Sequence, residues 1–211
     1  EAVGKLLHCL PRDVFLAPTG VIGEKRPQNR IINALPAAEA ALADANWEEA
    51  ARAIMTTDTF PKAARRDVHI GKTPVRIQGI AKGSGMIAPD MATMLAYVMT
   101  DAKLPQNVLQ SLLSSGVGPS FNSITVDSDT STSDMLLAFA TGAADNEPVT
   151  GVHDPELAEF TLAFNDLLLE LALLVVRDGQ GATQPIRVAV TGATSNFSAP
   201  KLAPPVPHSP L

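Results

Sequence analysis

Residues 82–95 read Lys-Gly-Ser-Gly-Met-Ile-Ala-Pro-Asp-Met-Ala-Thr-Met-Leu, so a glycine-rich segment leads into an apolar run. That run, residues 94–99, has the length of a buried strand. Upstream, residues 68–70 and 75–77 alternate around Gly71-Lys72, as the two arms of a β-hairpin do. The stretch therefore predicts a sheet with strands on both sides of the glycine-rich segment.

Helical patterns surround these predicted strands. Apolar residues recur at helical spacing in four segments: residues 2–10, 32–53 (with a break near 44–46), 104–117 and 154–177. The last segment opens with Asp154-Pro155, which indicates the start of a helix, because aspartate can cap a helix and proline fits its first turn. Its stretch 167–176 is apolar nearly all round, which predicts burial between layers or at a subunit contact. With short strands also predicted at 14–16 and 186–190, the alternation indicates an α/β sheet covered by helices.

The composition is that of a globular and mildly acidic chain. Of 211 residues, 45% are hydrophobic and 18% are charged, which excludes a disordered protein. The formal charge of −6 and the pI near 5.1 offer no basic surface for nucleic acid, so small metabolites are the expected partners. The single cysteine, Cys9, suits a reducing compartment, and its apolar neighbours predict a buried helix position. No uncharged stretch reaches about 18 apolar residues, so no membrane span is expected.

Thr93 carries the chemistry that these residues suggest. A threonine hydroxyl is a poor nucleophile unless a base lies beside it, and a freed α-amino group can be that base. Such an amine titrates near pH ~7.7–8.0, so part of it is unprotonated at neutral pH. The Ala92-Thr93 junction therefore fits a chain that breaks before Thr93. Taken alone, Thr93 is more commonly interpreted as a plain β-branched residue at the start of a buried strand.

Four segments together resemble the ornithine acetyltransferase family, the bifunctional glutamate N-acetyltransferases of arginine biosynthesis. Residues 82–95 resemble its self-cleavage motif, and Ala-Pro-Thr-Gly-Val-Ile-Gly-Glu at 17–24 resembles its oxyanion-hole segment. Ala-Ile-Met-Thr-Thr-Asp-Thr-Phe-Pro-Lys at 53–62 resembles its substrate-binding strand, and the Asp/Ser/Thr-rich residues 121–134 resemble one of its loops. Four segments in the right order over residues 1–192 are far more specific than one motif. The resemblance implies a layered α/β sandwich, here incomplete at both ends.

The resemblance also implies catalytic roles for three residues. Thr93 would cleave the chain at Ala92-Thr93 and then act as the nucleophile. Thr19, through its hydroxyl, and Gly20, through its backbone N–H, would form the oxyanion hole that acyl transfer requires. Without the wider match, Pro-Thr-Gly at this position is equally a plain turn.

Thr56, Lys82 and Thr93 are the implied substrate-binding residues, and a solvated loop lysine is the alternative interpretation of Lys82. The implied reaction passes an acetyl group from N-acetylornithine to Thr93, releasing ornithine, and then to glutamate. This ping-pong scheme needs no cofactor, and whether acetyl-CoA is also a donor is left open. The expected fragments, 1–92 and 93–211, would stay paired and form a homo-oligomer.

The sequence departs from the family at its ends. A Gly-Glu-Asp…Asn-Trp-Gly segment and a terminal Asn/Thr clamp do not occur, and residues 193–211 form a proline-rich tail of open structure. One alternative is therefore a truncated, non-catalytic relative. Another is an N-terminal-nucleophile amidohydrolase or aminopeptidase, which delivers the acyl group to water. A cytoplasmic location is expected, although Glu1 in place of an initiator methionine leaves organellar targeting open.

Asp127, Asp129 and Asp134 raise the question of a metal site. Their segment lacks the glycine and the distal glutamate of an EF-hand loop. We therefore expect no metal, and a hydrogen-bonded loop near the site instead.

Overall fold

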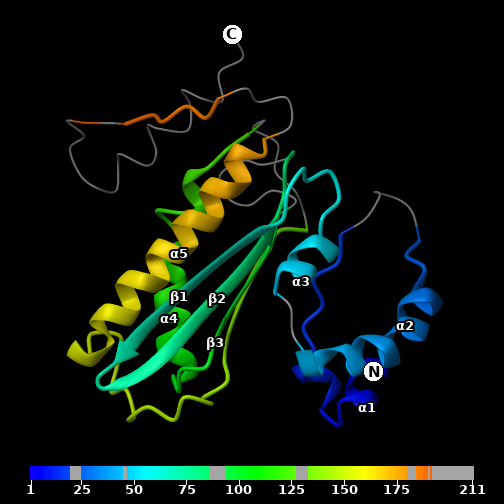
Figure 1. Cartoon of the computed structure of the whole chain (residues 1–211), viewed down its shortest axis with the longest axis horizontal. Coiled ribbons are helices and arrows are strands. Elements are labelled where there is room, and N and C mark those ends of the chain that lie inside the picture. Colours follow the sequence, from blue (N-terminus) through cyan, green and yellow to red (C-terminus); the bar gives the residue numbers. More distant parts are fainter. Residues whose placement is uncertain are drawn as a thin grey trace.

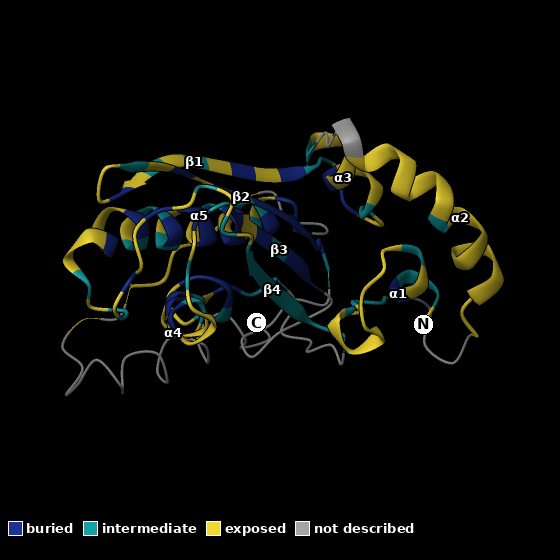
Figure 2. Ribbon diagram, turned by 90° about the horizontal axis from the view of Figure 1, so that it is seen from below, coloured by how far each residue is buried: buried dark blue, intermediate teal, exposed yellow. Residues whose placement is uncertain are grey.

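The computed structural model describes residues 1–19, 25–44, 47–85, 94–126, 133–179, 184–189 and 191. Within these residues the chain forms a four-stranded sheet in the order β1-β2-β3-β4. The strands are β1 (Lys62–Ile70), β2 (Thr73–Lys82), β3 (Leu95–Thr100) and β4 (Met135–Ala140); the first three are labelled in Figure 1 and all four in Figure 2. β2 runs antiparallel to β1 and β3, whereas β4 runs parallel to β3. The α/β class predicted from the sequence is confirmed.

The β1–β2 hairpin confirms the predicted pair of strands and is longer than the alternating residues alone suggested. Ile70 pairs with Thr73 across the turn, and Lys62 pairs with Ala81 at the far end. Gly71 has φ +58°, a left-handed conformation that glycine adopts without steric cost. The hairpin therefore turns where the sequence placed Gly71-Lys72.

Two long helices cover one face of this sheet. α5 (Ala158–Arg177) lies along β1 and β2, and α4 (Gln106–Val117) packs against α5 and β4 (Figure 1). Both confirm predicted helices, and a short 3-10 turn (Pro155–Leu157) precedes α5. On α5, Phe160, Phe164 and Leu171 have at most 1% exposure, and burial of each contributes roughly 1.5–3 kcal/mol. The opposite side of α5 is not fully covered, since Leu169 and Leu173 are 41% exposed.

The N-terminal helices lie together on one side of the sheet (Figure 1). α3 (Trp47–Ala53) contacts β1 and β2 and buries Ala51 completely. α2 (Gln28–Ala40) and α1 (Ala2–Leu6) extend beyond it, and α2 buries none of its residues (Figure 2). The predicted break between two helical pieces is confirmed, with a 3-10 turn at Ala41–Asp44.

Several local predictions are wrong. Residues 14–16 form no strand, and neither do residues 186–189 of the predicted strand 186–190, whose last residue lies outside the described chain. Within the described residues neither run pairs with another strand, and Ile186 is 87% exposed. α1 ends at Leu6, which leaves Cys9 exposed after the helix instead of buried within it. β4 was not predicted, although its continuous apolar sequence is typical of a strand that pairs in parallel with its neighbour. The predicted tail, residues 193–211, and the boundary at 192 lie outside the described residues.

Gly79→Ala is expected to lower the free energy of unfolding by about 1–3 kcal/mol, the usual cost of overpacking a core. An added Cβ would lie 2.7 Å from Leu171 Cδ1 and 3.0 Å from Leu167 Cδ2, and both leucines are fully buried. Gly151→Ala is the matched control, because nothing lies within 4 Å of its Cβ position, and its effect should stay within about 0.5 kcal/mol. Urea denaturation compares the two variants, and equal stabilities would contradict the expected crowding.

Candidate active site

Lys82 and Thr56, two of the residues assigned to substrate binding, are in direct contact. Lys82 ends β2, is 3% exposed, and donates a 2.8 Å hydrogen bond from Nζ to Thr56 Oγ1. Lys82 is therefore not a solvated loop lysine. Thr56 lies in the loop between α3 and β1, not on a strand as predicted, because Asp58 Oδ2 accepts its N–H at 3.1 Å and such local bonds compete with strand pairing. We call the contact between residues 56–59 and 82–84 the strand-end junction.

Two further hydrogen bonds join the same segments. Thr57 Oγ1 and Ser84 Oγ lie 3.0 Å apart, and Gly83 N–H donates to Asp58 Oδ1 at 2.7 Å. Gly83 has φ +147°, a conformation that residues with a side chain rarely adopt. Glycine at this position therefore lets the backbone turn its N–H towards the carboxylate.

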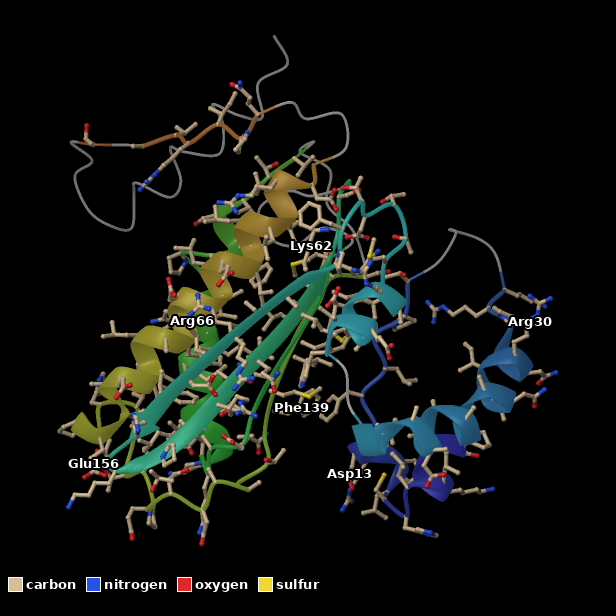
Figure 3. All side chains as sticks on the ribbon, viewed as in Figure 1. Asp13, Arg30, Lys62, Arg66, Phe139 and Glu156 are labelled. Atoms are coloured by element: carbon tan, nitrogen blue, oxygen red, sulfur yellow. The ribbon has the colours of Figure 1, made fainter. Side chains whose placement is uncertain are left out.

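Lys62, labelled in Figure 3, is fully buried and contacts Asp58 of the junction. Lys62, the first residue of β1, donates from Nζ to Asp58 Oδ1 at 2.6 Å and to Asp178 Oδ2 at 2.5 Å. Asp178, directly after α5, also accepts the Thr59 hydroxyl at 2.5 Å and the Thr59 N–H at 3.0 Å. We call Asp58, Lys62 and Asp178 the buried ion cluster, and its pairing meets the requirement that buried charges have partners.

Burial and hydrogen bonding act in opposite directions on the carboxylates of this cluster. Burial raises the pKa of Asp58, but hydrogen bonds from Gly83 N–H and from Lys62 outweigh it, so the pKa lies below its usual value. For Asp178, burial is likewise outweighed, first by the hydrogen bond from Lys62, and its pKa is also lowered. The pKa of Lys82 is lowered chiefly by burial, which the charge of Asp58 offsets in part and the charge of Lys62 reinforces. The carboxylates of Asp58 and Asp178 are therefore ionised at neutral pH.

The chain after the proposed cleavage point starts β3 beside Lys82. Leu95 pairs with Lys82 in the β2–β3 register. Met94 N–H donates to Asp134 Oδ1 at 2.8 Å, and the Met94 carbonyl accepts from Met135 N–H at 3.0 Å. Asp134 thus belongs to a hydrogen-bonded loop, as expected, whereas Asp127 and Asp129 lie outside the described residues.

The remaining predicted residues are placed only in part. Gly20, Ala92 and Thr93 lie outside the described residues. Thr19 is half-buried and makes no hydrogen bond to Lys82 or Thr56 within the described chain. The buried ion cluster was missed by sequence reasoning. Its only local signal was the presence of an acidic and a basic residue inside the segment 53–62.

The described ranges contain no group of three or more His, Cys, Asp or Glu side chains that could hold a metal ion. None of their helices is long and apolar enough to cross a membrane.

All of residues 1–211 match the model of the ArgJ family. The chain belongs to the ArgJ family. The resemblance inferred from the four sequence segments is thereby confirmed. This ArgJ-family chain is 74% identical over 211 residues to the arginine biosynthesis bifunctional protein ArgJ of Gluconobacter oxydans, a match that covers 100% of this chain and 50% of that protein.

Two further comparisons agree. The ArgJ protein of Brucella suis is 54% identical over 215 residues, covering 100% of this chain and 52% of its own length. The crystal structure of the ArgJ protein of Bacillus halodurans is 42% identical with a TM-score of 0.50, covering 54% of this chain and 53% of that one. The chain therefore spans about half the length of the curated ArgJ relatives it matches.

Proposed function

We propose that this ArgJ-family chain takes part in moving an acetyl group from N-acetylornithine to glutamate, through an acetyl-Thr93 intermediate that forms after self-cleavage at Ala92-Thr93. The observation that supports this most is the pairing of Lys82 with Leu95 at the strand-end junction. Leu95 follows Thr93 by two positions in the sequence. The start of β3, two residues after the proposed nucleophile, thus lies beside a proposed substrate residue.

Self-cleavage creates the base that the reaction needs. Thr93 Oγ attacks the Ala92 carbonyl carbon, the C–N bond breaks, and the nitrogen gains the hydroxyl proton to become a free amine. Water then hydrolyses the resulting ester, which yields the Ala92 carboxylate and restores the Thr93 hydroxyl. Thr93 then carries both a nucleophile and an adjacent amine base.

Acetyl transfer follows in two balanced half-reactions. The Thr93 amine takes the Oγ proton while Oγ attacks the acetyl carbonyl of N-acetylornithine, and Thr19 and Gly20 donate hydrogen bonds to the developing oxyanion. The C–N bond breaks, the amine returns the proton to the leaving nitrogen, and ornithine departs. The amine of glutamate then attacks the acetyl-Thr93 ester, so N-acetylglutamate leaves and the Thr93 hydroxyl is restored. No cofactor enters this scheme.

Lys82 and Thr56 fit the task of holding the substrate. An ammonium beside a hydroxyl can pair with a carboxylate, which N-acetylornithine and glutamate share. Because Lys82 is almost fully buried, its charge is poorly hydrated and an arriving carboxylate is a strong partner for it.

Cleavage would leave two interlocked fragments. The first fragment, 1–92, supplies β1 and β2, and the second, 93–211, supplies β3, β4 and α5. β3 pairs with β2, and α5 packs on β1 and β2. We expect this fragment pair to stay associated and to assemble into a homo-oligomer, which native mass spectrometry measures.

An acetyl-transfer assay tests the proposal. The protein in its full natural form is supplied with N-acetylornithine and glutamate, and we expect ornithine and N-acetylglutamate to appear in equal amounts. Release of acetate without N-acetylglutamate would identify a hydrolase instead. No turnover by a cleaved, folded protein would favour a non-catalytic relative. Replacing N-acetylornithine by acetyl-CoA determines whether a second donor is used.

Lys82→Met is expected to weaken ornithine binding by about 10–100-fold, because one charge-assisted hydrogen bond to the ligand carboxylate is lost. Lys72→Met is the matched control, since Lys72 is exposed in the β1–β2 turn. Titration calorimetry measures both variants. Lys82 binds the carboxylate only when it is protonated, and burial lowers its pKa from the usual 10.5. As the pH is raised, the affinity of the wild type should therefore begin to fall at a pH lower than 10.5. Equal affinities in the two variants would contradict the role of Lys82.

A further inference from the structure

The buried ion cluster contacts both sides of the strand-end junction. Asp58 accepts the Thr56 N–H through Oδ2 at 3.1 Å and the Gly83 N–H through Oδ1 at 2.7 Å. One of these backbone groups belongs to a proposed substrate residue, and the other directly follows Lys82. A single carboxylate therefore sets the spacing between Thr56 and Lys82.

The orientation of that carboxylate depends on residues deeper in the protein. Lys62 donates to both Asp58 and Asp178, and the three side chains are 0%, 0% and 2% exposed respectively. Water therefore has no access to substitute for a lost partner. Because Asp178 is itself held by the hydroxyl and N–H of Thr59, a change at Asp178 is transmitted through Lys62 to Asp58.

Charge balance supports the same connection. Lys62 pairs with both Asp58 and Asp178, and the charge of Lys82 also interacts with that of Asp58. Buried ion pairs can often be replaced by apolar side chains without loss of stability. Stability alone therefore does not explain three buried charges beside the substrate residues.

We propose that Asp178 is a positioning residue for substrate binding. From the end of α5, and through Lys62 and Asp58, it fixes the Lys82 ammonium and the Thr56 hydroxyl in the geometry that receives the substrate. This inference rests on the proposed function. It also means that a residue of the fragment 93–211 controls substrate affinity at two residues of the fragment 1–92.

Asp178→Asn in the full natural form of the protein provides the main test. We expect the KM for N-acetylornithine to rise about tenfold while kcat changes by less than about threefold, since one charge-assisted partner of the cluster is lost. Hydrogen exchange of the Gly83 amide should become about tenfold faster, because its acceptor Asp58 is less firmly held. The control Asp166→Asn removes an exposed carboxylate of α5 that pairs with Arg66, and it should leave all three quantities unchanged.

A gentler pair of variants covers the case in which Asp178→Asn does not fold. Thr59→Val removes the hydroxyl that donates to Asp178 and keeps the side-chain shape, whereas Thr59→Ser keeps the donor. We expect Thr59→Val to raise the KM severalfold and Thr59→Ser to match the wild type.

The outcomes separate the two proposals. A folded Asp178→Asn protein with unchanged KM and unchanged Gly83 exchange overturns the positioning role, as do equal KM values in the two Thr59 variants. If the wild type transfers no acetyl group, the proposed function fails. Hydrogen exchange of the Gly83 amide then still tests whether Asp178 is coupled to the junction. Faster exchange in Asp178→Asn then supports the coupling of Asp178 to the junction, and unchanged exchange overturns it.

Discussion

Thr93→Ala is expected to leave the chain unbroken and to abolish acetyl transfer. Alanine has no hydroxyl to attack the Ala92 carbonyl, and an uncleaved chain has no α-amine at position 93 to act as base. Wild-type protein should show two fragments that separate at Ala92-Thr93, whereas the variant should show one intact mass. Turnover should fall below about one-thousandth of the wild-type value, because the nucleophile and its base are lost together.

Thr93→Ser is the matched control for this experiment. Serine keeps a hydroxyl at the same position, so cleavage and transfer should both continue, at reduced rates. A Thr93→Ala protein that still splits before residue 93 would contradict the assignment of the nucleophile. An unbroken wild-type chain would mean that these residues do not assemble a cleavage site.

Lys62→Met is expected to lower the free energy of unfolding by about 3–5 kcal/mol, because it leaves Asp58 and Asp178 buried without a cation. Denaturant unfolding at pH 7 measures this loss. Lys72→Met, which changes an exposed lysine of the turn, should shift stability by less than about 0.5 kcal/mol. Equal stabilities would contradict the pairing of Lys62 with the two carboxylates.

The effect of Lys62→Met should also depend on pH. The lowered pKa values of Asp58 and Asp178 mean that their contribution to stability is fully present above the unfolded value of about 3.9 and is lost as pH falls through the folded values. The difference between wild type and Lys62→Met should therefore be largest near neutral pH and shrink in acid. A difference that grows in acid would argue against ionised carboxylates in the cluster.

The sequence predicted the elements whose signals are local. The β1–β2 hairpin follows from alternating residues around Gly71-Lys72, and α5 follows from a long apolar segment that opens with an aspartate and a proline. Strands that depend on a distant partner were predicted poorly. β4 pairs with β3 from about 40 positions away in the sequence, whereas residues 14–16 and 186–189 resemble strands locally but pair with no strand among the described residues.

The same contrast between local and long-range signals applies to the residues of the candidate site. The family resemblance selected Lys82 and Thr56, and the structure brings them into contact. The buried ion cluster could not be inferred, because Lys62 and Asp178 are 116 positions apart and meet only when α5 packs on β1. A single sequence carries no signal for that contact.

The most direct test of the account is the mass of the fragment that begins at Thr93 after N-acetylornithine is added without glutamate. The ping-pong scheme predicts that this fragment gains one acetyl group on its first residue, and that glutamate then removes it as N-acetylglutamate. A cleaved protein that forms N-acetylglutamate while the fragment never carries an acetyl group would contradict the covalent intermediate at Thr93.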